Sequence, residues 1–291
     1  MGGIAILVNP EEHRAAVLQF LDFYHITQKS PALAFLGEIL EKYTHLPYEN
    51  ISKIIKLNQD FLSLNRIRLP EQVINEHEQY RFGGTCFSLT FYLESILKTL
   101  GFICYPVMAD MRNQRNIHCA LIVLLERKKY LVDPGYLLTR PMEIHPDMPR
   151  LYRTKHTGVE LRFDKNDERY HLYTFDQTQT KWRYRFRDCP VSHRDFLMFW
   201  QESFFKSTMH SIVMTKIKED GMIYLHNDYL KISSIAGQHK QRLKSNYLTV
   251  IQDVFGIDPQ LVEQAQEALS RNMALERKFH IFTAKEKSET R

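Results

Sequence analysis

A cysteine preceded by two glycines is the residue of this sequence with the clearest chemical potential. Gly83 and Gly84 allow a sharp backbone turn, and the apolar spacing that follows predicts a helix starting at Cys86. The free N–H groups and the dipole of a helix N-terminus favour the nucleophilic thiolate, and the same N–H groups could hold an oxyanion. The alternative is a buried, inert cysteine, because Cys86 shares one helix face with Leu89 and Leu93. The local pattern leaves both interpretations open.

A nucleophilic cysteine needs a base and a group that orients the base, and His118 and Asp133 are the best candidates. They bracket a predicted hairpin whose two apolar strands flank a charged turn over 126–129. The two residues face each other directly only if the turn is centred near residues 125 and 126, and a later centre displaces them by a few residues. Each also has a purely structural interpretation, as a half-buried histidine at a strand end and a turn-forming aspartate.

Other kinds of chemistry find less support in the sequence. There is no H-E-x-x-H pair, no G-x-G-x-x-G, no Walker lysine loop and no G-x-S-x-G. The four cysteines show no C-x-x-C spacing, so neither a disulfide framework nor a cysteine zinc site is predicted. Metal, dinucleotide and serine-hydrolase functions are therefore disfavoured, and we expect neither metal ligands nor a bound cofactor.

Composition and charge are those of an ordinary globular protein. The 39 basic and 34 acidic residues are interleaved, and the formal net charge of +5 is mild, which disfavours nucleic acid as a partner. The opening residues 1–8 lack a basic leader. The longest apolar run, Cys119 to Leu125, is far shorter than the roughly 20 residues that span a bilayer. We therefore expect a cytoplasmic protein with no membrane partner.

Helical spacing dominates the first hundred residues. Helix starts are indicated by capping residues or by a proline in the first turn, and a glycine marks the end of the most apolar helix. We expect four helices, which begin near Pro10, Pro31, Pro70 and Cys86, the last of them ending before Gly101.

Two apolar runs follow, and after them comes the alternation typical of strands; together they predict a twisted sheet or small barrel. The expected strands cover 117–125, 130–133, 159–163, 170–172 and 182–186. The last third is mixed, with a helix over 192–206, two strands around the turn 219–221, helices after Gln238 and Pro259, and a solvated tail over 284–291. In this interpretation Lys240 and Arg242 lie on the polar face of a helix.

The order Gly-Gly-x-Cys, then His, then Tyr-Leu-Val-Asp-x-Gly-Tyr resembles the arylamine N-acetyltransferase family, including its amide-synthase relatives. Segment 45–51 is similar to the family's Pro-Phe-Glu-Asn-Leu, and 97–102 looks like the Leu-Gly-Phe that closes the cysteine helix. Further similar segments occur in the same order at 195–196, 207–208, 220–221 and 255–257. The resemblance covers roughly residues 15 to 260.

The resemblance implies an α+β fold with a papain-like cysteine-nucleophile architecture. An N-terminal helical bundle over 1–101 would carry the nucleophile, and a central antiparallel β-barrel over 102–191 would carry the histidine and the aspartate. A C-terminal α/β lid with final helices and a tail would occupy 192–291.

The resemblance also implies a function. Cys86, His118 and Asp133 would form a catalytic triad that moves an acetyl group from acetyl-coenzyme A, a co-substrate, to an arylamine, arylhydrazine or arylhydroxylamine by double displacement. Tyr136 stands where the family has a phenylalanine lining the acceptor pocket. Thr208, together with Lys206, Ser207, Lys216 and Lys218, could contact the phosphates of coenzyme A.

The chain departs from the family pattern in several places. Phe82 stands where the family has the arginine that precedes the two glycines, so a buried arginine partner for Glu49 is not expected from that position. Ser88 and Pro134 are further departures. The alternatives are an amide synthase or another acyltransferase with a different donor, a hydrolase with the same triad, and a non-enzymatic interaction protein on the same scaffold.

Overall fold

The computed structural model describes most of the chain. It covers residues 8–281, apart from residues 113, 155–156, 177–178, 220 and 235–236 and the side chain of residue 64. The opening run over 1–7, Asp220 of the expected turn and the expected tail over 284–291 therefore lie outside the described residues. In the part of the chain that is described, none of the helices combines the length and the apolar character needed to cross a membrane.

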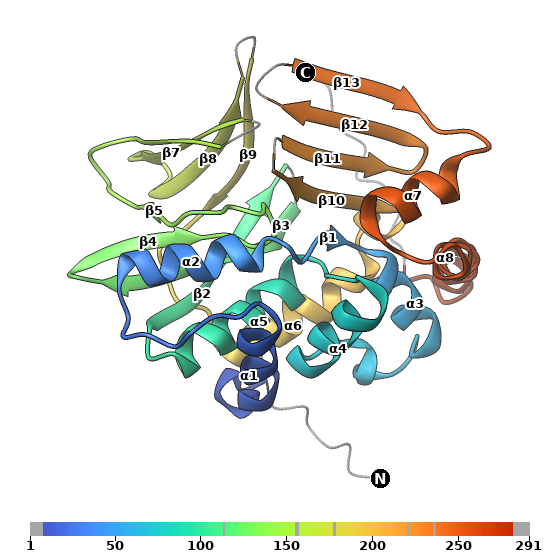
Figure 1. The fold of residues 1–291 in the computed structure, drawn as a ribbon, viewed down its shortest axis with the longest axis horizontal. Coiled ribbons are helices and arrows are strands. Elements are labelled where there is room, and N and C mark those ends of the chain that lie inside the picture. The colour runs from blue at the N-terminus through green and yellow to red at the C-terminus, as the bar shows by residue number, and fades with distance from the viewer. Residues whose placement is uncertain are drawn as a thin grey trace.

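Helices fill the first part of the chain, and one of them, α5, lies at their centre (Figure 1). The elements of this part are η1 (Pro10–Glu12), α1 (Arg14–Phe23), α2 (Leu33–Tyr43), β1 (Tyr48–Glu49), α3 (Ile51–Gln59), η2 (Leu64–Arg66), α4 (Pro70–Tyr80) and α5 (Cys86–Thr99). α5 contacts α1, α4 and two strands of the adjacent sheet, so nearly all of its side chains are buried. This central position makes α5 the scaffold on which the nucleophile is held.

The end of α5 is fixed by a glycine in the left-handed conformation. Gly101 has φ of 85°, and its N–H donates to the carbonyl of Lys98 at 3.0 Å. The N–H of Phe102 donates to the carbonyl of Leu97 at 2.9 Å, which completes a Schellman motif. The chain thus turns sharply out of the helix and enters the sheet.

Eight strands form a nearly closed barrel in the middle of the chain (Figure 1). They are β2 (Ile103–Met111), β3 (Gln114–Leu125), β4 (Lys128–Val132), β5 (Met142–Glu143), β6 (Arg150–Arg153), β7 (Gly158–Asp164), β8 (Arg169–Phe175) and β9 (Thr180–Phe186). Their order is β5-β4-β3-β2-β9-β8-β7-β6, and the two edge strands β5 and β6 contact each other. Inward-facing side chains such as Ile122, Leu131 and Leu172 fill the interior.

The hairpin of β3 and β4 settles the register that the sequence left open. Leu125 pairs with Lys128, so the loop is the two-residue turn of Glu126 and Arg127, whose φ angles are 50° and 64°. Two successive positive φ angles are typical of the type I′ turn that joins tight hairpins. The centre therefore lies later than residues 125 and 126, and Leu121 pairs with Val132 rather than placing His118 and Asp133 directly opposite each other.

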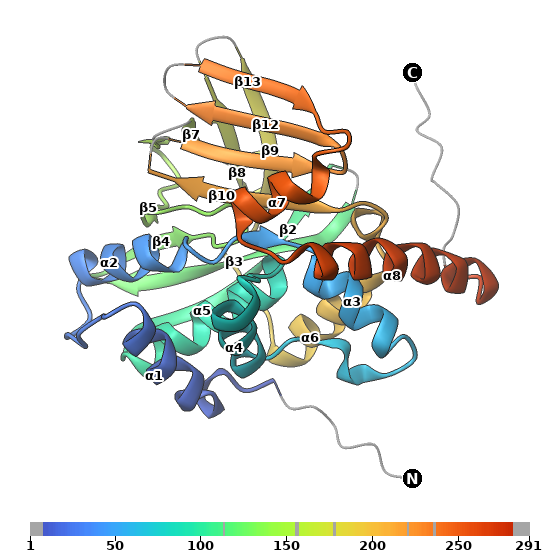
Figure 2. The same ribbon diagram turned by 45° about the vertical axis from the view of Figure 1, so that its right-hand side comes forward.

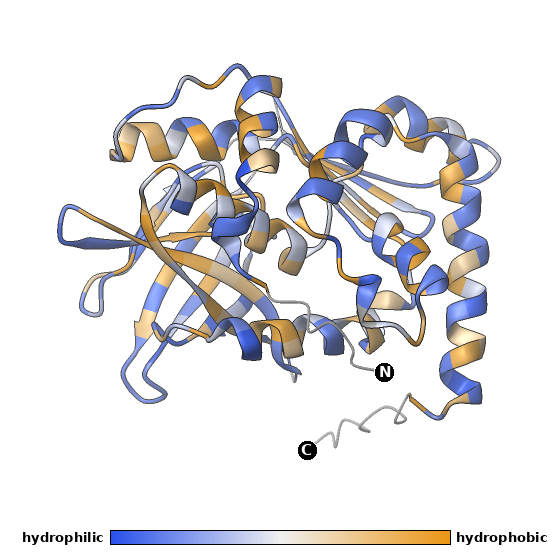
Figure 3. Ribbon diagram, turned by 90° about the horizontal axis from the view of Figure 1, so that it is seen from below, coloured by the Kyte–Doolittle hydropathy of each residue, from blue (hydrophilic) through white to orange (hydrophobic). Residues whose placement is uncertain are grey.

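A second sheet forms the lid (Figure 2). The elements of this part are α6 (His193–Glu202), η3 (Ser203–Phe205), η4 (Ser207–Met209), β10 (Val213–Lys218), β11 (Gly221–His226), β12 (Tyr229–Ser234), β13 (Gly237–Arg242), α7 (Tyr247–Phe255) and α8 (Pro259–Lys278). The strand order β1-β10-β11-β12-β13 includes β1 from the helical part, so the two parts share one sheet. α8 packs along α3, and Figure 3 shows hydrophobic and hydrophilic bands alternating along it.

The expected fold class is confirmed, whereas several elements differ from the sequence-based expectation. Helices, a nearly closed eight-stranded barrel and an α/β lid make up the α+β architecture. The domain boundaries expected from the sequence, 1–101, 102–191 and 192–291, stay a prediction. The first expected helix is divided into η1 and α1, and α3 and β2 were not predicted. Buried polar residues such as Ser52 obscure the apolar face of α3, and Pro106 argues against a strand at β2.

The helix expected after Gln238 begins later, as α7 at Tyr247, and the prediction that residues 238–242 are helical was wrong. This segment is β13, and all of its side chains are exposed, so no apolar pattern marks it as a strand. Backbone pairing with β12 defines it instead, with Lys240 opposite Lys231. Arg242 forms an ion pair with Asp228 rather than lying on a helix face.

Of the two glycines before α5, Gly83 is required by a close approach of two backbone segments, and Gly84 lies against the side chain of Ser88. A Cβ atom on Gly83 would lie 1.9 Å from the carbonyl oxygen of Pro47. The N–H of Gly84 donates to that same carbonyl at 3.2 Å, and the N–H of Glu49 donates to the carbonyl of Gly84 at 3.0 Å. A Cβ on Gly84 would lie 2.3 Å from the hydroxyl of Ser88. The start of α5 is thus tied directly to β1.

Replacing Gly83 by alanine should destabilise the protein, because the added methyl group meets backbone that cannot move aside. We expect Gly83→Ala to lower the free energy of unfolding by at least about 2 kcal/mol, measured by urea unfolding. Gly37→Ala is the matched control, since nothing lies within 4 Å of its Cβ and it stands in the interior of α2. There alanine should be neutral or stabilise by up to about 1 kcal/mol. Equal stability of the two variants would contradict the importance of this contact.

Candidate active site

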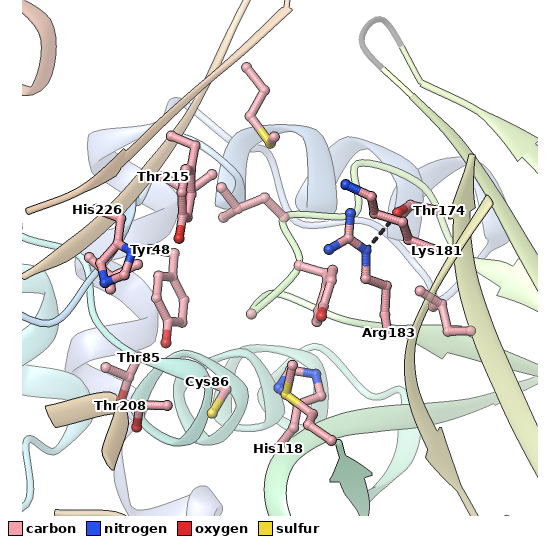
Figure 4. Close-up of a pocket in the computed structure, with 18 of the residues that line it drawn as sticks. Tyr48, Thr85, Cys86, His118, Thr174, Lys181, Arg183, Thr208, Thr215 and His226 are labelled. Carbon is pink, nitrogen blue, oxygen red and sulfur yellow. Dashed lines mark hydrogen bonds between the residues drawn. The ribbon is translucent and has the colours of Figure 1, made fainter. Parts of the chain in front are cut away.

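Cys86 is the first residue of α5 and faces a cavity between the barrel and the lid (Figure 4). Its N-cap, Thr85, makes no side-chain hydrogen bond to the helix, so the first N–H groups of α5 are not capped by that hydroxyl. The residue is 8% exposed, and its Sγ lies 3.8 Å from the carbonyl oxygen of Ile117. The thiol is therefore held at a helix N-terminus with only a small opening to solvent.

His118 and Asp133 meet diagonally across the hairpin. His118 donates from Nε2 to Oδ2 of Asp133 at 2.8 Å, and both residues are almost fully buried. The same Oδ2 accepts a hydrogen bond from the hydroxyl of Tyr184 at 2.6 Å, and Oδ1 accepts the N–H of Tyr136 at 3.0 Å. Asp133 thus fixes the tautomer of His118, whose other ring nitrogen is left for Cys86.

The electrostatic surroundings favour a thiolate and an imidazolium. A hydrogen bond from the Cys119 thiol lowers the pKa of Cys86 well below its ordinary value; burial opposes this, and a hydrogen bond from His118 and its charge add to it. Burial lowers the pKa of His118, but the charge and hydrogen bond of Asp133 outweigh burial and raise this pKa to about 10. The two residues therefore suit an ion pair near neutral pH.

Gly135 leaves the space in which these three side chains meet. A Cβ on this glycine would lie 2.8 Å from Cε1 of His118, 2.9 Å from Cβ of Cys86 and 3.3 Å from Oδ1 of Asp133. Any side chain at this position would push against all three groups. The glycine after Pro134 is therefore part of the geometry of the site.

A buried ion-pair network under the site was not predicted from the sequence. Arg68, just before α4, lies 3.7 Å from Oε1 of Glu49 and donates from Nη1 to the carbonyl of Gly83 at 2.9 Å. It also donates to the hydroxyl of Ser52, which in turn donates to Glu49. A residue distant in sequence thus places a buried guanidinium near Glu49. No local pattern around Arg68 marks it for this role.

The cavity above Cys86 has a volume of about 960 Å³. Tyr136, expected on the acceptor side, lines it and packs edge-on against His118, with ring centroids 5.3 Å apart. Thr208 and Ser207 also line it, and the carbonyl of Thr208 accepts a hydrogen bond from Asn50. The other expected donor contacts lie outside the lining, and these are Lys206, Lys216 and Lys218.

One group of possible metal ligands stands apart from this cavity. Asp164, Asp167 and His171 lie close together on the barrel. Asp167 is already paired with His171 and with Arg185, and Trp182 donates to His171. Asp167 and His171 are thus already engaged by neighbouring side chains.

Comparison with known sequences identifies the family. The sequence profile of the N-acetyltransferase family matches residues 32–264, which is most of the chain. The chain belongs to the arylamine N-acetyltransferase family. Members of this family are enzymes that transfer an acetyl group, with acetyl-coenzyme A as the co-substrate. A search of curated proteins found no match.

Solved structures share the fold of this N-acetyltransferase at low sequence identity. An arylamine N-acetyltransferase from Mycobacterium abscessus matches with a TM-score of 0.75 and 18% identity over 93% of this chain and 99% of that one. A Mycobacterium marinum enzyme, solved in complex with CoA, gives 0.72 and 18% over 88% and 98%. A Bacillus cereus enzyme with a Cys-His-Glu catalytic triad gives 0.67 and 19% over 84% and 98%.

The lowered pKa of Cys86 should appear in its reactivity toward iodoacetamide. Because the thiolate persists until the pH falls through this lowered pKa, the alkylation rate should decline much less between pH 8 and pH 6 than that of an ordinary thiol. A thiol with the ordinary pKa of about 8.5 would slow nearly a hundredfold over that range. Cys86→Ala locates the adduct by mass, and His118→Ala should move the inflection upward. A steep decline between pH 8 and pH 6 in the wild type would refute the ion pair.

Filling the space at Gly135 should impair acyl transfer more than folding. We expect Gly135→Ala to reduce the rate of Cys86 acetylation by at least about a hundredfold, because the methyl group displaces His118 from Cys86. Stopped-flow or quenched-flow mass spectrometry measures this rate, and thermal unfolding checks the fold. Gly37→Ala should acetylate at the wild-type rate. Normal acetylation of Gly135→Ala would show that these groups do not need their observed spacing.

Proposed function

We propose that Cys86, His118 and Asp133 carry the acetyl transfer of this enzyme by double displacement. The acceptor is an aromatic amine, hydrazine or hydroxylamine. The observation that carries the proposal is that a thiol at a helix N-terminus and a histidine line one cavity, and that a buried carboxylate holds the histidine from behind. This combination provides a nucleophile, a base and an orienting group in the order that nucleophilic catalysis requires.

In the first step the Cys86 thiolate attacks the thioester carbonyl of acetyl-coenzyme A. The carbonyl oxygen becomes an oxyanion, for which the first N–H groups of α5 are suitable donors. When the intermediate collapses, the bond to the coenzyme A sulfur breaks, and that sulfur takes a proton from the His118 imidazolium. One thioester has replaced another, so the step needs orientation and charge stabilisation more than driving force.

In the second step the acceptor nitrogen attacks the acetyl group on Cys86. The nitrogen acquires positive charge as its bond to carbon forms, and neutral His118 takes the proton from it. The Cys86 thiolate then leaves, which restores the starting ion pair. Asp133 stabilises the imidazolium, and Tyr184 is a positioning residue that holds Asp133 through its hydroxyl.

The cavity and the thiols support assignments of the substrate sides and of the location. We assign Tyr136 to the acceptor side, because its ring packs on His118, and Thr208 to the donor side, because it lies across Cys86 from His118 (Figure 4). All four cysteines are free thiols, which supports the cytoplasm as the location, since its reducing conditions keep thiols free.

Intact-mass analysis after mixing with acetyl-coenzyme A tests the mechanism. The wild type should gain one acetyl group, Cys86→Ala should gain none, and an arylamine should discharge the adduct while itself becoming acetylated. Cys104→Ala is a matched control at a buried thiol outside the cavity and should acetylate normally. Discharge by water alone would indicate a hydrolase. Failure of the wild type to react with this or any other thioester would overturn the proposal.

A further inference from the structure

The residues that line the cavity carry more positive than negative charge. Among the described residues that line it, Asp176 is the only carboxylate, and its side chain accepts a hydrogen bond from Gln238. The lining cations are Lys53, Arg112, Lys181, Arg183, Lys231 and Lys240. Clefts of one charge sign within low-dielectric walls concentrate ligands of the opposite sign. The cavity therefore suits a substrate that carries negative charge.

Arg183 points into this cavity because of an irregularity in the barrel. Leu172 pairs with Tyr184 and Tyr173 pairs with Trp182, so Arg183 is an extra residue of β9 without a partner on β8. Such a β-bulge redirects side chains and is common next to active sites. Figure 4 shows Arg183 on the barrel wall of the cavity beside Lys181, above His118.

One hydrogen bond holds the Arg183 side chain and leaves its outer end available. Nε donates to the hydroxyl of Thr174 at 2.6 Å. Among the described residues, no carboxylate forms an ion pair with this half-buried guanidinium, although Arg185, on the same strand, pairs with Asp110 and Asp167. Removing a charge from water without a partner costs free energy. The two terminal nitrogens of Arg183 are thus available to donate hydrogen bonds to a ligand in the cavity.

Arg183 stands close to the reacting groups. The next residue, Tyr184, donates its hydroxyl to Asp133. Burial raises the pKa of Tyr136, and the charge of Arg183 is the largest effect that opposes it, which places this charge near the ring that packs on His118. The phosphates of acetyl-coenzyme A are separated from the thioester by the long pantetheine arm. A guanidinium on the cavity wall above His118 therefore suits the shorter substrate, which is the acceptor.

We propose that Arg183 binds the carboxylate of an acidic aromatic amine, such as an aminobenzoate, whose amino group then faces acetyl-Cys86. The inference rests on the proposed function and names its acceptor class. A guanidinium offers two parallel N–H donors that match the two oxygens of a carboxylate. Thr174 is the residue that positions it. Arg183 takes no part in the bond changes and acts on specificity.

The test compares three acceptors with acetyl-coenzyme A as donor: 4-aminobenzoate, its neutral methyl ester and the cationic 4-aminophenyl-trimethylammonium. In the wild type, kcat/KM for the acid should exceed that for the ester by at least about tenfold. Arg183→Gln should lower kcat/KM for the acid by about 10- to 100-fold and for the ester by less than about threefold. Arg183→Glu should reverse the preference toward the cation, a gain that general damage to the site could not produce.

Two further variants separate binding from structure. Arg185→Gln removes an arginine from the same strand whose partners are Asp110 and Asp167, and it should leave the ratio of acid to ester unchanged. Thr174→Val removes the hydroxyl that holds Nε and should lower the ratio only in part. Thermal unfolding and the extent of Cys86 acetylation verify that each variant is folded and loaded.

The outcomes distinguish this inference from the proposed function. If the wild type acetylates the ester as well as the acid, the proposed function stands and the role of Arg183 is refuted. If Arg183→Gln raises KM for acetyl-coenzyme A and leaves the ratio unchanged, the guanidinium serves the phosphates of the donor and the inference is wrong. If no amine discharges acetyl-Cys86, the proposed function fails, and the inference fails with it.

Discussion

The structure depends on one close contact between two stretches of backbone, Pro47–Glu49 and Gly83–Gly84. The contact leaves no room for a Cβ on Gly83, and its hydrogen bonds set both the position and the direction of the first turn of α5. The guanidinium of Arg68 reinforces it by bonding to the Gly83 carbonyl from beneath. Since Cys86 is the first helical residue, its placement follows from this contact rather than from the packing of its own side chain.

The second constraint is the diagonal meeting of His118 and Asp133. The hydrogen bond between the carboxylate and the imidazole forms although the register does not place the two residues opposite each other. His118 is two residues from the position opposite Asp133, and residues two apart on a strand face the same side of the sheet. The resulting offset leaves room for Gly135 and for the Tyr184 hydroxyl. Burial alone would keep His118 neutral, so the carboxylate decides its charge state, and through it the state of the thiol.

Much of this fold could be predicted from the sequence because the corresponding signals are local. The start and end of α5 are marked by glycines, and the hairpin strands by continuous apolar runs. The missed features depend on contacts distant in sequence. β13 is a strand only through its pairing with β12, and Arg68 has its role only after folding brings it beneath Gly83. The bulge at Arg183 likewise cannot be read from the sequence, because it is defined by the pairing of β9 with β8.

The two-residue strand β1 has a consequence for how the protein is made. Tyr48–Glu49 pairs on one side with Gly84 and on the other with β10, more than 150 residues later in the chain, where Tyr48 lies opposite Thr215. During synthesis the first pairing becomes possible long before the second. A growing chain on the ribosome therefore carries its reactive cysteine with one wall of the cavity absent. The thiol becomes enclosed only after most of the polypeptide has been translated.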